Sequence, residues 1–169
     1  MRKIALIPFL LLASIVYSQD FIITHKGESI KCNVTELTET AIKYKYEGEQ
    51  VVNSISKNAV GEIKFASGRV QKITDKVNVN SEADWERVQI TQSEDDVEGL
   101  VRKKELLAKA NAGTAFSKST KVEQRAIDKL KKEAAANGCH IILLSKSSDR
   151  TNWSGQHVST KVSGIAYSY

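Results

Sequence analysis

Short runs in which apolar and polar residues alternate fill the first half of the chain, and they constrain its fold more than any other feature. The clearest runs cover residues 30–34, 42–46 and 62–65, and turn residues separate them. A period of two places the apolar side chains on one face of a β-strand. Because the runs are short, evenly spaced and free of helix-period segments, residues 19–74 are predicted to form a small antiparallel β meander or barrel.

A single long helix is predicted over residues 121–137. Thr120 and Glu123 have the spacing of a capping box at its start, and Gly138 occupies the position where helices commonly stop. The apolar residues that recur at helical spacing between them are Val122, Ala126, Ile127, Leu130 and Ala134.

The segments on either side of this helix are predicted to be strands. Residues 85–91 and 157–167 are strand-like, and the apolar run 141–144 is typical of a central strand covered on both faces. Gly164 shifts the apolar alternation of the last strand, which predicts a β-bulge. Residues 100–110 have a helix-friendly composition but no clean apolar stripe, so a strand or bent hairpin is favoured over a helix.

These elements predict an α+β fold, with a small all-β module at residues 19–74, a linker at 75–84 and an α+β module at 85–169. In the second module the helix at 121–137 packs on a sheet. A chain of this length is large enough to bury a core without disulfides or metals, whereas each module alone would be marginal.

Residues 1–18 have the order of a secretory signal peptide. Arg2 and Lys3 precede an uncharged apolar run that is too short to span a bilayer, and Ser18 provides a small residue for cleavage. Cleavage between Ser18 and Gln19 leaves 169 − 18 = 151 residues and lowers the formal net charge from +5 to +3. We therefore expect an exported protein, periplasmic or extracellular, with no transmembrane segment after signal removal.

The charges and cysteines narrow the range of partners. Residues 19–76 carry 9 bases and 8 acids, and residues 77–169 carry 14 and 12. Because neither half has a large basic excess, we expect no nucleic-acid partner.

Cys32 lies in an alternating run and Cys139 begins an apolar one. Both are interpreted as buried hydrophobic residues, and a disulfide between them is the alternative that export allows.

The patterns expected of a catalytic, cofactor or metal site are missing from the sequence. The three histidines, His25, His140 and His157, do not have metal-ligand spacing. The acidic cluster at residues 94–98 does not match a calcium-binding loop, and no nucleophile-elbow or catalytic-cysteine pattern is present. We therefore expect a protein that is not an enzyme and that uses no cofactor or metal.

The polar segment 145–156, predicted to be a loop, contains one large apolar residue, Trp153. Exposed tryptophans are frequent anchors in protein recognition. Trp153, Arg150 and His157 therefore make up a candidate recognition loop. The alternative is that Trp153 folds back onto the sheet as a lid over the core.

Residues 20–73 resemble a β-rich module that is common in exported proteins of the Bacteroidota. The similarity lies in the turn at residues 26–28, the strand at 42–44, and the segments 55–60 and 65–68. The end of the signal peptide at residues 17–19 is similar to those of the same group.

Residues 85–169 resemble small periplasmic or lipoprotein domains related to the Rcs envelope-stress sensor. The similarity lies in residues 126–130 and 132–135, in Gly138 followed by an apolar strand, and in the closing residues 164–167. This resemblance implies a sheet with one helix packed across it, and neither resemblance implies a catalytic residue.

Taken together, the sequence predicts an exported, non-enzymatic protein that acts through contacts with a protein or a component of the bacterial cell envelope. The alternative is a hydrolase, or a protein that binds a small ligand or metal, with a site in the cleft between the two modules. The sequence predicts neither an identified partner nor an oligomeric state.

Overall fold

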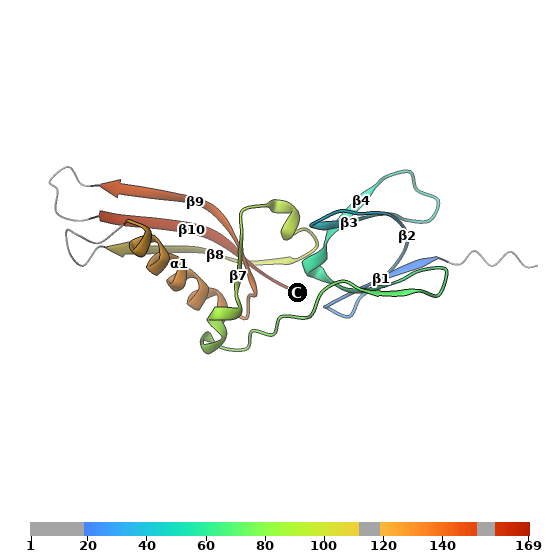
Figure 1. The fold of residues 1–169 in the computed structure, drawn as a ribbon, viewed down its shortest axis with the longest axis horizontal. Helices are drawn as coiled ribbons and strands as arrows, with labels where there is room; N and C mark the ends of the chain where they lie inside the picture. The colour runs from blue at the N-terminus through green and yellow to red at the C-terminus, as the bar shows by residue number, and fades with distance from the viewer. Residues whose placement is uncertain (1–18, 112–118, 152–157) are drawn as a thin grey trace, which may run out of the picture.

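The fold was obtained as a computed structural model, which describes residues 19–111, 119–151 and 158–169. The side chains of residues 119, 146–151 and 158 are outside this description. In the described part, the chain forms two β-sheets toward opposite ends of an elongated body, and helix α1 (Ser119–Ala136) packs on the second sheet (Figure 1). The predicted α+β class is confirmed.

The first sheet has six antiparallel strands in the order β4-β3-β2-β1-β5-β6. It is open, with β4 and β6 at its edges, so the predicted closed barrel is not confirmed. A strict meander is not confirmed either, because the short 3₁₀ helix η1 (Lys57–Ala59) returns the chain from β4 to pair with β1. The strands are β1 (Asp20–Thr24), β2 (Ser29–Leu37), β3 (Ala41–Lys45), β4 (Asn53–Ser56), β5 (Val60–Lys64) and β6 (Val70–Lys72).

The alternation in the sequence sets the inward face of this sheet. Ile22 of β1 lies opposite Ile30 of β2 and Ile63 of β5, and the flanking positions on each strand are more exposed. The buried cluster that results consists of Ile22, Cys32, Ile42, Tyr44, Ile55, Ala59, Val60 and Ile63. Removing these apolar side chains from water is the main stabilisation that this half of the chain obtains.

The second sheet has four strands in the order β7-β9-β10-β8. The pair β7–β9 is parallel and the others are antiparallel, and α1 covers one face. The strands are β7 (Gln89–Thr91), β8 (Val101–Asn111), β9 (Ile141–Thr151) and β10 (Val158–Ser168). Residues 100–110 are therefore in a strand, as favoured, and Ile141 and Ile142 are fully buried in β9, between β7 and β10.

Helix α1 ends where the sequence predicts. Gly138 has a φ of 66° and donates its N–H to Ala135 O, while Cys139 N–H donates to Ala134 O, both at 2.9 Å. This pair of bonds is the Schellman arrangement, in which glycine avoids the strain of a positive φ. The predicted start at residue 121 is two residues late, because α1 begins at Ser119 and Thr120 lies in its first turn.

Two other predictions are wrong. Residues 85–87 belong to the 3₁₀ helix η2 (Glu82–Arg87), because the Asp84 carboxylate accepts the N–H of Asn80 and thereby fixes a turn before the strand begins. Residues 145–151, predicted to be a loop from their polar composition, extend β9 because they pair with β10. Cross-strand hydrogen bonds outweigh weak local propensity here. The predicted bulge at Gly164 is confirmed by the register shift between Ser163 and Gly164.

The two sheets contact each other through the acidic segment 94–98. The side chains of Ser56 and Asn58 donate to Asp96 O at 2.8 and 3.0 Å, and Ser56 N–H donates to Glu98 O at 2.9 Å. The segment thus contacts the first sheet through its backbone carbonyl groups.

Cys32 and Cys139 are free thiols buried in the two separate cores, so no disulfide joins them.

Candidate functional site

Strand β8 presents very different residues to its two sides. Leu106, Ala108 and Ala110 are buried beneath α1, whereas the side chain of Leu107 between them is 63% exposed on the opposite side of the sheet. Figure 1 shows α1 on one side of β8 and β10 only. We call the other side the open face and define it by Leu107, Lys109, Lys161, Ser163 and Ile165.

The open face is hollowed next to Leu107. The hollow has a volume of about 520 Å³, and the small residues Ser163 and Gly164 at the β-bulge are among those that line it. At Gly164 a Cβ atom would lie 2.8 Å from Leu143 O, so this position has no room for a side chain. The lining residues are Glu105, Leu106, Leu107, Ser145, Ser163, Gly164 and Ile165. The hollow thus combines the apolar side chains of Leu107 and Ile165 with two serines and the Glu105 carboxylate, and it is open to solvent.

Two lysines lie directly opposite each other beside this hollow. Lys109 of β8 is the register partner of Lys161 of β10, and both are exposed. Like charges at opposed positions of an antiparallel pair destabilise it. Within the described residues neither ammonium group has an ion-pair partner, whereas Arg102 of the same strand pairs with Glu105. A carboxylate supplied from outside would relieve the repulsion between the two lysines.

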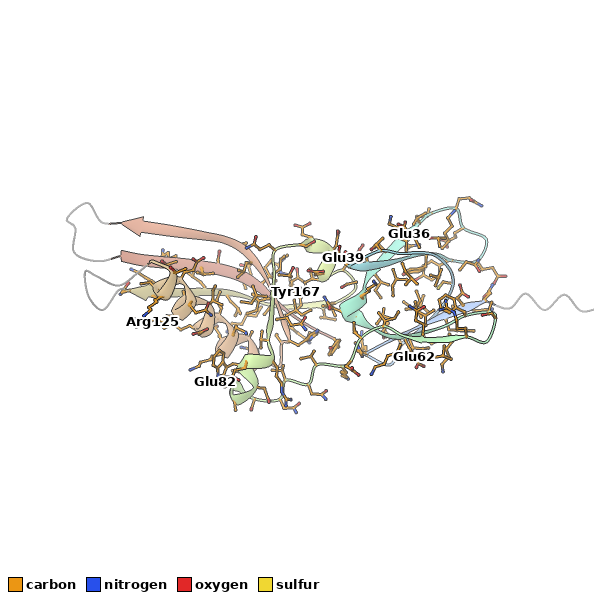
Figure 2. All side chains as sticks on the ribbon, viewed as in Figure 1. Glu36, Glu39, Glu62, Glu82, Arg125 and Tyr167 are labelled. Atoms are coloured by element: carbon orange, nitrogen blue, oxygen red, sulfur yellow. The ribbon has the colours of Figure 1, made fainter. Side chains whose placement is uncertain are left out.

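The chain segment that forms β8, α1, β9 and β10 is basic. Residues 101–169 carry 13 bases and 5 acids, a net +8, and residues 19–100 carry 10 and 15, a net −5. The two values sum to the +3 expected of residues 19–169. Figure 2 shows Glu36 and Glu62 on the first sheet, Glu39 in the turn between β2 and β3, and Arg125 on α1, with Glu82 of η2 on the side of that helix. Division of the sequence at residue 76 hides this excess, because residues 77–100 contain one base and seven acids.

A second group of functional side chains lies where the two sheets meet. The ring of Tyr169, just after β10, stacks on His140 with centroids 3.8 Å apart and meets the edge of His25 at 5.0 Å. Val77 N–H donates to the Tyr169 hydroxyl at 2.9 Å. Three segments that are distant in sequence therefore converge on one aromatic ring.

His25 is held by the segment that links the sheets. Its Nε2 lies 2.8 Å from the hydroxyl of Thr74, which itself lies 2.8 Å from Val60 O. Lys76 Nζ donates to His25 O at 3.0 Å. Burial and the nearby Lys76 ammonium lower the pKa of His25, and Asp75 opposes them. The first two effects favour the neutral form of the imidazole.

His140 is the most unusual polar residue of this junction. It is only 2% exposed, and its Nε2 has no hydrogen-bond partner among the residues that the structure describes. Burial, with smaller contributions from His25 and Lys76, lowers the pKa of His140 to about 4. The residue also lines a pocket of about 350 Å³ together with Asn58, Thr74, Asp75, Val77, Gln89, Ile141 and Tyr169. The pocket combines a neutral imidazole with amide, hydroxyl and apolar groups and one carboxylate.

The residues predicted as a recognition loop fall mostly outside the described part of the chain. Trp153 and His157 are not among the described residues, and Arg150 is described only as a backbone position of β9 that pairs with Ser159. Of the predicted cleavage site, Ser18 is outside the description and Gln19 is buried immediately before β1.

Sequence reasoning missed both the open face and the junction. The segment 105–110 did contain a signal, because small or apolar residues alternate there with Glu105, Leu107 and Lys109, which makes Leu107 an apolar residue on the polar side. His25 and His140 both contact Tyr169 because of how the two sheets pack. The spacing of these residues in the sequence does not predict that contact.

Within residues 19–111, 119–151 and 158–169, no three His, Cys, Asp or Glu side chains are grouped so that they could hold a metal ion. The same residues include no helix that is long and apolar enough to cross a membrane. Comparison with known proteins finds no matching family model, curated protein or solved structure.

Proposed function

We propose that this chain is an exported, non-enzymatic protein that binds an acidic, extended segment of a protein partner at the cell envelope on its open face. The observation that carries the proposal is the opposed pair Lys109 and Lys161, which lies on the same face as a hollow and the exposed side chain of Leu107. Charge complementarity of this kind steers binding and selects the partner.

A polypeptide suits this surface better than a simple anion because the surface is both apolar and cationic. An extended segment with alternating apolar and acidic residues places an apolar side chain in the hollow and a carboxylate near the lysines. Strand β8 is also an edge of its sheet, so the backbone groups on its outer side are open to pairing with a further strand.

Export is supported by the order of residues 1–18, with a basic start, an apolar middle and a small residue at the end. Strand β1 begins at Asp20, so a chain cut after Ser18 retains all ten strands and α1. The intact mass of the protein recovered from the producing cell tests this point. We expect the mass of residues 19–169, and the mass of the full chain would contradict the proposal.

Binding is tested by NMR titration of residues 19–169 with a synthetic peptide in which glutamate and valine alternate. We expect the amide signals of Leu107, Lys109, Lys161 and Ile165 to shift. The variant K109E/K161E should bind at least tenfold more weakly. The peptide with lysine in place of glutamate should not bind.

The matched control is K121E/R125E, which makes the same change in net charge on exposed residues of α1, away from the open face. This variant should retain more than half of the affinity. Equal loss of binding in both variants would show a general charge effect and contradict the assignment to the open face.

Small-ligand binding at the junction is a second candidate function. Buried His140 favours it, because it lines a pocket of about 350 Å³ and its Nε2 has no partner within the described part of the chain. A screen of uncharged hydroxyl-bearing fragments should shift the His140 imidazole signals of the wild type. If no fragment does so at millimolar concentration, this second candidate is excluded.

A further inference from the structure

The loop between β3 and β4, residues 46–52, is an exposed apolar and acidic surface. Val51 and Val52 are 64% and 52% exposed, and Tyr46 is 40% exposed. Glu47 and Glu49 are exposed beside them, and the loop contains no base. Its chemistry is thus the reverse of the open face, with apolar side chains flanked by carboxylates where the open face has ammonium groups.

The loop holds its apolar residues away from the core by its backbone conformation. Gly48 has a φ of 76°, and Glu49 N–H donates to Tyr46 O, which closes a turn. Asn53 Nδ2 also approaches Val51 O at 3.5 Å. The last buried residue of β3 is Tyr44, and both valines remain exposed to water. Exposed apolar residues next to each other are typical of a contact surface.

The loop and the open face lie toward opposite ends of the molecule. Figure 1 shows the β3–β4 connection at the end of the first sheet that is remote from β8, β9 and β10. A single copy therefore presents the acidic loop at one end and the basic open face at the other.

We propose that the loop of one copy docks on the open face of a second copy, so that the chains associate head to tail. This inference rests on the proposed function, because it uses the same open face and names a second copy of this chain as its partner. Val51 or Val52 enters the hollow beside Leu107, and the carboxylates of Glu47 and Glu49 approach Lys109 and Lys161.

The existing contacts of the loop are weak enough to be exchanged. Glu47 lies 3.9 Å from Lys31, and both side chains are more than half exposed. Such a surface pair contributes little to stability. Because docking uses different patches on the two copies, each dimer retains one free loop and one free open face. The association is therefore heterologous and continues into chains unless it closes into a ring.

Sedimentation velocity of residues 19–169 over a concentration series tests this association. We expect the weight-average mass to rise with concentration, beyond that of a dimer, in 20 mM salt, and to return to the monomer in 1 M salt. At 1 M salt, electrostatic attraction is screened within about 3 Å. A wild type that stays monomeric up to 1 mM in 20 mM salt overturns the inference.

Charge reversal separates specific docking from non-specific attraction. The variants E47K/E49K and K109E/K161E should each weaken association at least tenfold, and the variant that combines all four substitutions should regain it. The control K121E/R125E should associate within threefold of the wild type. Failure of the combined variant to regain association, with its circular dichroism spectrum unchanged, overturns the inference.

The V51S/V52S variant tests the apolar part of the contact, and we expect at least a tenfold loss of association.

The glutamate–valine peptide distinguishes the proposed function from the association of two copies. If the peptide binds the open face but the wild type stays monomeric, the second copy is not the partner and the proposed function stands. If neither binds, both are wrong.

Discussion

The imidazole of His140 stacks on the phenol ring of Tyr169 with an angle of 18° between the planes, and this contact lies where the two sheets meet. The imidazole of His25, which follows β1, also contacts the Tyr169 ring, with an angle of 61° between the planes. One tyrosine thus connects a residue of the first sheet with a residue of the second. The stability of each sheet therefore depends on the other through this ring.

Replacement of Tyr169 measures how much this connection contributes. Tyr169→Phe leaves the rings in contact but removes the acceptor of Val77 N–H, which should cost about 1 kcal/mol. Tyr169→Ala also removes the contacts with both histidines and should cost at least about 1 kcal/mol more. Urea unfolding at pH 7 measures both values. An alanine variant no less stable than the phenylalanine variant would contradict the role of the ring.

The junction should make the protein less stable in acid. The pKa of His140 is lowered from 6.5 to about 4 in the fold, so the unfolded chain takes up a proton at a higher pH than the folded one. The stabilisation is complete above pH 6.5 and is lost as the pH falls to about 4, an effect on the order of 3 kcal/mol. The lowered pKa of His25 acts in the same direction.

Carboxylates also titrate in this range, so the variant His140→Phe is the control for the pH effect. It retains an aromatic ring against Tyr169 and removes the titrating group. Denaturant unfolding between pH 4 and pH 7 should show a shallower pH dependence for this variant than for the wild type. Identical slopes would contradict the assignment of the effect to His140.

Gly99 tests the packing of the acidic segment against the first sheet. It has a φ of 82°, and a Cβ atom there would lie 2.7 Å from Ile55 Cγ1. Gly68 has a similar φ of 84° with open space around it. Gly68→Ala should therefore cost about 1 kcal/mol from backbone strain alone, and Gly99→Ala about 1–3 kcal/mol more from overpacking. Equal costs in urea unfolding would show that the segment does not pack against Ile55.

Adjacent residues of β8 provide a test of the open face. Leu106→Ala removes a buried side chain from beneath α1 and should cost about 2–5 kcal/mol in thermal or urea unfolding. Leu107→Ala removes an exposed one and should change stability by less than about 0.5 kcal/mol. Similar costs for the two variants would mean that Leu107 is covered, and the open face would then not be open.

The two cysteines report on the two cores separately. Burial and the Asp20 carboxylate raise the pKa of Cys32 to about 11, and burial raises the pKa of Cys139. Because the thiolate is the reactive form, both should resist alkylation at pH 8 in the folded protein. Pulse labelling in increasing urea should modify both over the same narrow range, since the junction couples the sheets. Labelling of one thiol well before the other would show independent unfolding.

The parts of the fold that follow from local pattern were predicted from the sequence. Period-two alternation located the strands around Ile30, Ile42 and Ile63, and helical spacing with Gly138 located α1 and its end. The errors arose where pairing between distant segments decides the structure. Polar residues 145–151 became a strand because β10 lies beside them, and the open edges of the first sheet followed from the pairing of β5 with β1.

The candidate site was less predictable than the fold for the same reason. Lys109 and Lys161 are separated by 52 positions and become neighbours only through the register of β8 and β10. His25, His140 and Tyr169 come together only because the two sheets meet end to end. Sequence patterns of a few residues contain neither relationship.

The separation of charge between residues 19–100 and residues 101–169 affects the molecule before any contact is made. Residues 101–169 carry a net +8, residues 77–100 near the middle of the elongated body carry a net −6, and residues 19–76 carry a net +1, so the body has an electric dipole moment whose positive end lies on the side of the second sheet. In the field of an anionic surface or partner, such a body rotates during diffusion so that its basic end leads. Productive encounters should therefore become faster as ionic strength falls.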